Sequence, residues 1–139
     1  MAVSEKHLRC VGLLLLRVGV GVSLCVAHGW DKLMGGPEKW AKVGAAGMST
    51  FGIDQGLQAF GLIASLSESI FALMVAVGLL TRSAATLAAL TMFTAMAMHI
   101  DNGDSFGKIS HPLELGVVFA AIALMGPGRL SLDYLIKRR

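Results

Sequence analysis

The stretch FGLIASLSESIFALMVAVGLL, residues 60–80, constrains this chain most, because it is almost wholly apolar and carries one formal charge, Glu68. About 20 helical residues, each rising about 1.5 Å, cross the roughly 30 Å hydrocarbon core of a bilayer. The composition agrees, since 55% of the residues are hydrophobic and only 15% are charged, whereas soluble domains carry about 25% charged residues. The segment is therefore predicted to span a membrane.

Three further segments have the same apolar character and comparable length. They cover residues 8–28, 83–99 and 112–126. The last is short for a full crossing, so we expect it to extend through Gly126 or to lie in a locally thinned bilayer. The sequence predicts an all-α protein in a single domain, residues 1–139, that forms an integral membrane four-helix bundle.

Lysine and arginine are distributed unequally between the predicted loops. The N-terminus, the turn at Arg82 and the C-terminal tail hold seven of them, whereas the other two loops hold four. Because positively charged loops face the cytoplasm, both termini are predicted to be cytoplasmic. The net charge of +3 is thus a topology signal, and it gives no indication of nucleic-acid binding.

The first outer loop, residues 29–59, is long enough to hold structure of its own. A glycine pair precedes Pro37, which suits the first turn of a helix. Trp40 follows with lysines on both sides. This pattern predicts a short helix that lies at the membrane–water interface.

Arg17 and Glu68 are the two ionisable residues deepest in the predicted spans. A charged side chain at that depth costs several kcal/mol, about 3 or more, unless it is compensated. The two residues differ in depth by about 5 Å on these boundaries, which an arginine side chain can bridge. An Arg17–Glu68 ion pair is therefore predicted. It has two interpretations, a device that fixes helix register or a group that exchanges protons or binds a ligand.

Three more ionisable residues, His28, His99 and Glu114, lie near the predicted outer ends of their helices. With Asp31, Asp101 and Asp104 nearby, they predict a polar pocket that opens to the outer face. Glu114 has a simpler explanation as a capping-box residue in the first turn after Pro112.

Metal and disulfide chemistry are not predicted. No spacing of histidines, cysteines and carboxylates matches a metal site. Cys10 and Cys25 lie about 22 Å apart along one helix, which is beyond disulfide reach.

Several segments recur together in one known family. They are LLLLRVGVG with Arg17, HGWDKL from His28, VGLLTRSAA after Glu68, MHIDNGDSF around His99, and Glu114 followed by GPGRLSLD. In this order they resemble the DoxX family of small four-helix bacterial and archaeal membrane proteins. The resemblance implies a compact bundle in the bacterial inner membrane. Some relatives are subunits of thiosulfate:quinone oxidoreductases, and others are associated with thiol-redox or oxidative-stress proteins.

Two functions from different classes follow. The first is a redox-linked subunit in which a quinone head group enters between the helices, hydrogen-bonds to His28 or His99, and exchanges protons with Glu68 or Glu114. Because the chain shows no flavin, haem or dithiol motif, electrons would come from a partner protein, and no covalently bound cofactor is expected. The second is a non-catalytic module that docks a partner protein or another copy of itself within the lipid bilayer.

Overall fold

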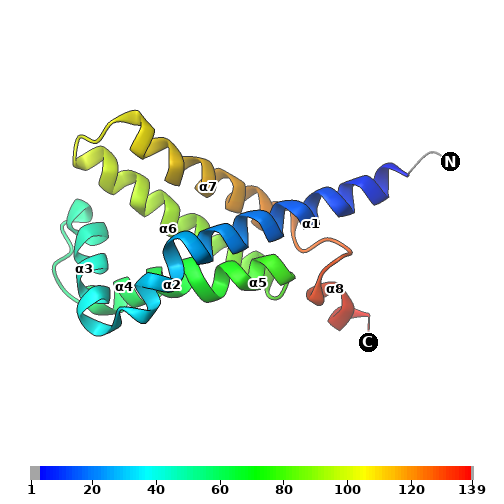
Figure 1. Cartoon of the computed structure of the whole chain (residues 1–139), viewed down its shortest axis with the longest axis horizontal. Helices are drawn as coiled ribbons and strands as arrows, with labels where there is room; N and C mark the ends of the chain where they lie inside the picture. The colour runs from blue at the N-terminus through cyan, green and yellow to red at the C-terminus, as the bar shows by residue number, and fades with distance from the viewer. Residues whose placement is uncertain (1–3, 139) are drawn as a thin grey trace.

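The computed structural model describes residues 4–138, and that part of the chain is helical with no strand. Four helical segments are long and apolar enough to cross a membrane: Glu5–Met34, Leu57–Val77, Thr81–Asp101 and Phe106–Met125. The predicted all-α bundle with four spans is confirmed. In Figure 1, α8 and the start of α1 lie at the right, which we call the α8 end. The opposite end, which carries α3, is called the α3 end.

The first span is longer than predicted. It runs through α1 (Glu5–Leu24), the π-helical turn η1 (Cys25–Gly29) and α2 (Trp30–Met34) without a break. The predicted end at His28 is wrong. The charged residues that follow His28 have ion-pair partners on other elements, so they do not force the helix to stop.

The predicted short helix is present as α3 (Gly36–Met48), with Pro37 in its first turn, and the 3-10 turn η2 (Ser49–Phe51) follows it. Helix α3 crosses α4 (Leu57–Leu66) at a pair of glycines. A Cβ on Gly44 would lie 1.8 Å from the backbone oxygen of Leu57, and one on Gly61 would lie 1.7 Å from that of Trp40. Only glycine allows the two backbones to approach this closely. A position of α3 at the membrane interface stays a prediction.

The second span consists of α4, the π-helical turn η3 (Ser67–Phe71) and α5 (Ala72–Val77). It packs against α1 through small residues. Ala72 and Ala76 are buried, and a Cβ on Gly21 would lie 2.4 Å from the backbone oxygen of Ala72. Close packing of this kind holds membrane helices together where lipid removes the hydrophobic driving force.

Helices α6 (Thr81–Asp101) and α7 (Phe106–Met125) form an antiparallel hairpin (Figure 1). Helix α7 begins six residues before Pro112, so the predicted start at that proline is wrong. Pro112 is the seventh residue of α7 and removes one intrahelical hydrogen bond, which helices packed in a membrane bundle tolerate. Glu114 is consequently exposed two turns inside α7, and the capping-box explanation fails.

The interior of the bundle is built from small side chains, and its outer surface is apolar. Ala84, Ala85 and Ala88 of α6 are buried beside Phe119 and Ile122 of α7. Outward-facing residues include Leu15, Val26 and Leu124, which are 68%, 73% and 80% exposed. An apolar exterior on four long helices is what contact with lipid requires.

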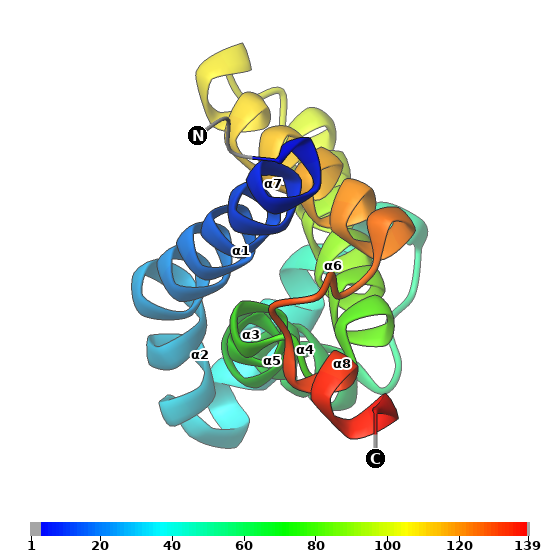
Figure 2. The ribbon, with the colours of Figure 1, turned by 90° about the vertical axis from the view of Figure 1, so that its right-hand side faces the viewer.

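Asp133 connects the last helix, α8 (Leu132–Lys137), to the turn between α5 and α6. Its carboxylate accepts hydrogen bonds from the backbone N–H groups of Leu80 and Thr81, at 2.8 and 2.9 Å, and from the Thr81 hydroxyl at 2.8 Å. Its own N–H donates to the carbonyl of Gly78 at 2.8 Å. In the view from the α8 end (Figure 2), α8 accordingly lies in front, beside α5 and the start of α6.

The hydrogen bonds at Asp133 predict a pH-dependent contribution to stability. Burial alone would raise the pKa of Asp133, but the hydrogen bonds from Thr81 and Leu80 outweigh it, so the pKa lies below its ordinary value. A carboxylate with a lowered pKa stabilises the fold above its unfolded pKa of about 3.9, and this stabilisation is lost as the pH falls through the folded value.

We therefore expect Asp133→Asn to lower the unfolding midpoint in detergent at pH 7 by the equivalent of about 1–2 kcal/mol. The amide NH2 would face backbone donors where an oxygen now accepts. The difference from wild type should shrink once the pH is low enough to protonate Asp133. Asp54→Asn, at an exposed loop position, is the matched control, and equal midpoints for both variants at pH 7 would contradict the role of Asp133.

Candidate functional site

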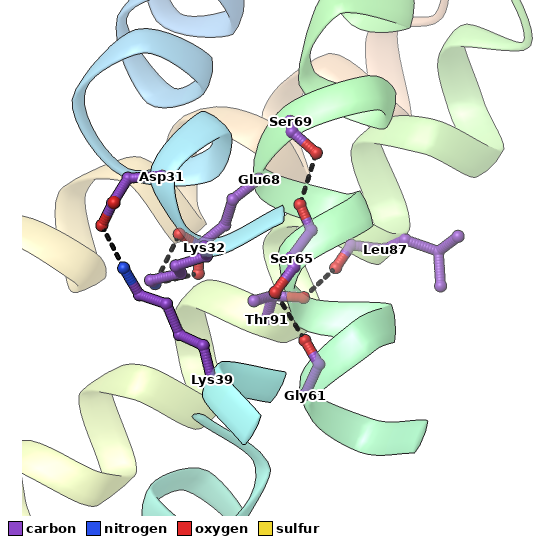
Figure 3. Close-up of polar contacts among 9 residues, drawn as sticks. All are labelled: Asp31, Lys32, Lys39, Gly61, Ser65, Glu68, Ser69, Leu87 and Thr91. Carbon is purple, nitrogen blue, oxygen red and sulfur yellow. Dashed lines mark hydrogen bonds and ion pairs between the residues drawn. The ribbon is translucent and has the colours of Figure 1, made fainter. Parts of the chain in front are cut away.

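Glu68 is paired with Lys32 in the interior of the bundle. The Nζ of Lys32 donates to both carboxylate oxygens, at 2.8 and 2.6 Å (Figure 3). The side chain of Glu68 is 3% exposed and that of Lys32 is 29% exposed. The carboxylate in the second span is thus compensated by a cation that reaches in from a more open position.

The predicted Arg17–Glu68 ion pair is wrong, because the register of the two helices separates these residues. Arg17 lies against Gly78, where a Cβ would be 2.0 Å from Nη1 of Arg17, whereas Glu68 lies against Gly29. The two levels are about 15–18 Å apart along the helices. The prediction placed Arg17 too deep because it ended the first helix at residue 28.

Arg17 finds a different partner at the α8 end. It is 1% exposed, and its Nη2 donates to the backbone oxygen of Leu130. Its Nε and Nη1 have no hydrogen-bond partner in the part of the chain that the structure describes. Arg17 therefore tethers the C-terminal segment to α1 and takes no part in the environment of Glu68.

Two π-helical turns face each other where Glu68 meets the first span. A Cβ on Gly29 of η1 would lie 2.1 Å from the backbone oxygen of Glu68 in η3, so the backbones touch and only glycine fits. In a π-helical turn the backbone hydrogen bonds join residues five apart, where those of an α-helix join residues four apart. Such turns are rare and occur frequently at functional sites. Ser65 and Ser69 also donate to the carbonyls of Gly61 and Ser65, one turn earlier (Figure 3), a bonding pattern that bends helices.

Contacts from α3 hold Lys32 in place. The Trp40 indole donates to the backbone oxygens of Lys32 and Leu33 at 3.1 and 3.2 Å. Lys39 pairs with Asp31 at 2.5 Å (Figure 3), and the Asp31 side chain is 83% exposed. Asp31 thus joins α2 to α3 and does not enter the interior.

A polar cavity of about 180 Å³ opens beside the ion pair, and we call it the histidine cavity. Helices α1, α2, α6 and α7 and the turns η1 and η3 enclose it. The rings of His28 and His111 lie 5.3 Å apart between centroids. The polar side chains that line it are His28, Lys32, Glu68, His99, Lys108 and His111.

The turn between α6 and α7 positions His99. Nδ1 of His99 lies 2.8 Å from Asp104, and Lys108 donates to the other carboxylate oxygen at 2.7 Å. These hydrogen bonds, that from His99 first, hold the pKa of Asp104 below its ordinary value. The ionised carboxylate fixes the orientation of the imidazole, which leaves Nε2 as the ring nitrogen available to a ligand.

An apolar cavity of about 240 Å³ adjoins the histidine cavity between α3, α4 and α6. Its lining includes Val43, Phe60, Ala64 and Met98. The two cavities share Lys32, Glu68, Ala95 and Met98 as lining residues. The ion pair therefore lies at the boundary between a polar and an apolar space.

The structure brings together part of the predicted pocket. His28, Glu68 and His99 line the histidine cavity as expected.

Asp31, Asp101 and Glu114 lie outside the histidine cavity, contrary to the prediction. Asp101 is exposed near Thr50, which donates to it at 3.4 Å.

Sequence reasoning missed His111, Lys108 and Lys32 as pocket residues. Lys32 follows His28 by four residues, a spacing that places both on one face of a helix. It would have been found had the first helix been extended past His28. Lys108 and His111 precede Pro112, and the expected helix start at that proline left them in a loop.

Four long apolar helices around a polar cavity define a multi-pass membrane protein. The family model described as DoxX matches residues 12–100, which is more than half of the chain. The protein belongs to the DoxX family. No curated protein and no solved structure matches the chain.

The Lys32–Glu68 pair predicts an energetic coupling that a double-mutant cycle measures. Lys32→Gln leaves a buried carboxylate without its cation, which is expected to cost about 3–5 kcal/mol. Combining it with Glu68→Gln should recover much of that loss, because neither charge then stays unpaired. The readout is the unfolding midpoint of each variant in detergent.

The matched control is the cycle between Arg17→Gln and Glu68→Gln. Arg17 also carries a buried positive charge but lies at another level of the bundle, so its effect should add to that of Glu68→Gln without coupling. Coupling in the Arg17 cycle, or simple additivity in the Lys32 cycle, would refute the pairing.

Proposed function

We propose that this protein binds a quinone head group in the histidine cavity and exchanges protons with it, as a subunit of an oxidoreductase assembly in the bacterial inner membrane. The observation that carries the proposal is the Lys32–Glu68 pair at the boundary of a polar and an apolar cavity. The excess of basic residues at the α8 end supports a cytoplasmic location for that end.

A quinone matches this arrangement because it combines two carbonyl oxygens with an apolar ring and tail. The imidazole N–H of His28 and the ammonium of Lys108 can donate to the carbonyls. His99 can donate through Nε2 in its imidazolium form, because its Nδ1–H faces the carboxylate of Asp104. The adjoining cavities, of about 180 and 240 Å³, together reach the roughly 300–1,000 Å³ of small-molecule sites.

Reduction of a quinone to a quinol consumes two electrons and two protons. Glu68 and His99 line the cavity, and side chains of these types transfer protons to bound substrates. The proposal assigns the electrons to a partner protein, because the sequence contains no dithiol or haem-attachment motif. The protein then supplies the binding site and the proton path.

A non-catalytic docking module is the second candidate, and Glu114 favours it. This carboxylate is exposed on α7 within a membrane span, where an unpaired charge is costly. A partner helix with a basic side chain would compensate it. On this alternative, the histidine cavity serves only the stability of the bundle.

Tryptophan fluorescence tests quinone binding directly, because Trp40 contacts Lys32 and the chain has only two tryptophans. Titration of the purified protein in nanodiscs with a short-chain benzoquinone or naphthoquinone should quench the emission saturably. Removing one hydrogen-bond donor with His99→Ala should weaken binding about tenfold.

Asp101→Asn is the control for this titration, since Asp101 lies on the same helix outside the cavity and its loss should leave the affinity unchanged. Quenching that does not saturate, or that is equal in wild type and His99→Ala, would favour the docking module instead.

A further inference from the structure

A third cavity lies at the α8 end, and the proposed function does not involve it. Its volume is about 480 Å³, and it separates the start of α1 from the segment between α7 and α8. Its polar lining consists of Ser4, Lys6, His7, Arg129 and Tyr134. We call it the basic cavity, since lysine, histidine and arginine line it and, among residues 4–138, no carboxylate does.

Glu5 and Asp133 are the sequence neighbours of the cavity residues Lys6 and Tyr134, and both carboxylates have partners outside the cavity lining. Glu5 is exposed and pairs with Arg9 at 3.6 Å. Asp133 is occupied by the hydrogen bonds of Leu80 and Thr81. An anion that enters the cavity therefore meets Lys6, His7 and Arg129, and no carboxylate among residues 4–138 lines the cavity beside them.

Arg129 is held at the cavity by Tyr134. The guanidinium of Arg129 lies 6.0 Å from the centroid of the Tyr134 ring, and that of Arg138 lies 5.6 Å from it. Contacts of a guanidinium with an aromatic ring at this distance are attractive. Arg129 is therefore positioned beside the ring of Tyr134, a residue that also lines the cavity and carries a hydroxyl donor.

Arg17 lies behind the cavity wall, where the carboxylate of Asp133 offsets part of its positive charge. Its Nη2 bonds to the carbonyl of Leu130, and Leu130 lines the cavity. The buried guanidinium keeps Nε and Nη1 without a partner among residues 4–138. The first backbone N–H groups of α1 also point to this end, and a helix start favours anions.

We infer that the basic cavity binds a phosphate group, and that its source is the headgroup of an anionic phospholipid. Guanidinium, ammonium and hydroxyl donors together are the groups that recognise phosphate oxygens. The cavity lies at the start of a membrane span, the level at which headgroups are found. Leu130 lines the cavity, is 45% exposed and offers apolar surface to an acyl chain.

Native mass spectrometry of the full chain in a neutral detergent tests this inference. Titration with phosphatidylglycerol should show one tightly held lipid, and phosphatidylcholine should bind much more weakly. Arg129→Gln should weaken retention of phosphatidylglycerol about tenfold, because a charge-assisted hydrogen bond is lost. Lys6→Gln, at an exposed position in the first turn of α1, should act likewise and stands in if Arg129→Gln does not fold.

Lys137→Gln removes the same charge from α8 at an exposed position outside the cavity and should change retention by less than about twofold. If Arg129→Gln and Lys6→Gln lose phosphatidylglycerol and Lys137→Gln does not, the result supports a lipid headgroup as the source of the phosphate. In a separate arm, the unfolding midpoint is measured against inorganic phosphate. Saturable protection by phosphate that Arg129→Gln abolishes, without a preference for phosphatidylglycerol, would support the phosphate site with the free anion as its source.

Two results would overturn the site. One is equal retention of phosphatidylglycerol and phosphatidylcholine together with no effect of inorganic phosphate. The other is a loss of phosphatidylglycerol retention in Lys137→Gln as large as that in Arg129→Gln. The loss would then follow from the net charge of the protein and would not require the cavity. Neither result bears on quinone binding, because the histidine cavity shares no residue with the basic cavity.

Discussion

A carboxylate buried among apolar helices requires a cation within hydrogen-bond reach, and much of this structure follows from how Glu68 meets that requirement. Lys32 supplies the cation only because the first helix continues past His28. The first span can deliver Lys32 only because Gly29 lets its backbone touch that of Glu68. The ion pair, the two π-helical turns and the glycine contact are therefore parts of one arrangement, and both cavities at the α3 end share its two charged residues.

The two ends of the bundle carry separate polar networks with different physical tasks. At the α8 end, Asp133 and Arg17 hold the C-terminal segment against the turn between α5 and α6 and against α1. At the α3 end, histidines and lysines surround open space. Tight contacts among alanines and glycines lie between them. A ligand bound at one end of the bundle therefore contacts none of the side chains that stabilise the opposite end.

Much of the fold could be predicted, because a bilayer imposes length and apolarity on every span. The same rule does not specify where a helix ends when its charged residues find partners, as Asp31 and Lys32 do. The predicted first helix ends at His28, about one and a half turns before its observed end at Met34. That difference gives Glu68 the wrong predicted partner, because two side chains on neighbouring helices can pair only where they lie at the same height along the helix axes. His28, Glu68 and His99 were found because ionisable residues in apolar segments are conspicuous. Lys108 and His111 escape the sequence analysis because a helix start at Pro112 leaves both in a loop.

The sequence by itself determined the membrane class, the four spans and several of the polar residues that lie inside. These features depend on composition and on periodicity within one helix, which a sequence displays directly. Only the tertiary structure decided that Lys32 pairs with Glu68, that Arg17 and Asp133 hold the C-terminal segment, and that a basic cavity lies at the α8 end. Each of these depends on the relative register of helices, which is set by backbone contacts at a few glycines. The periodicity of a single segment does not specify that register.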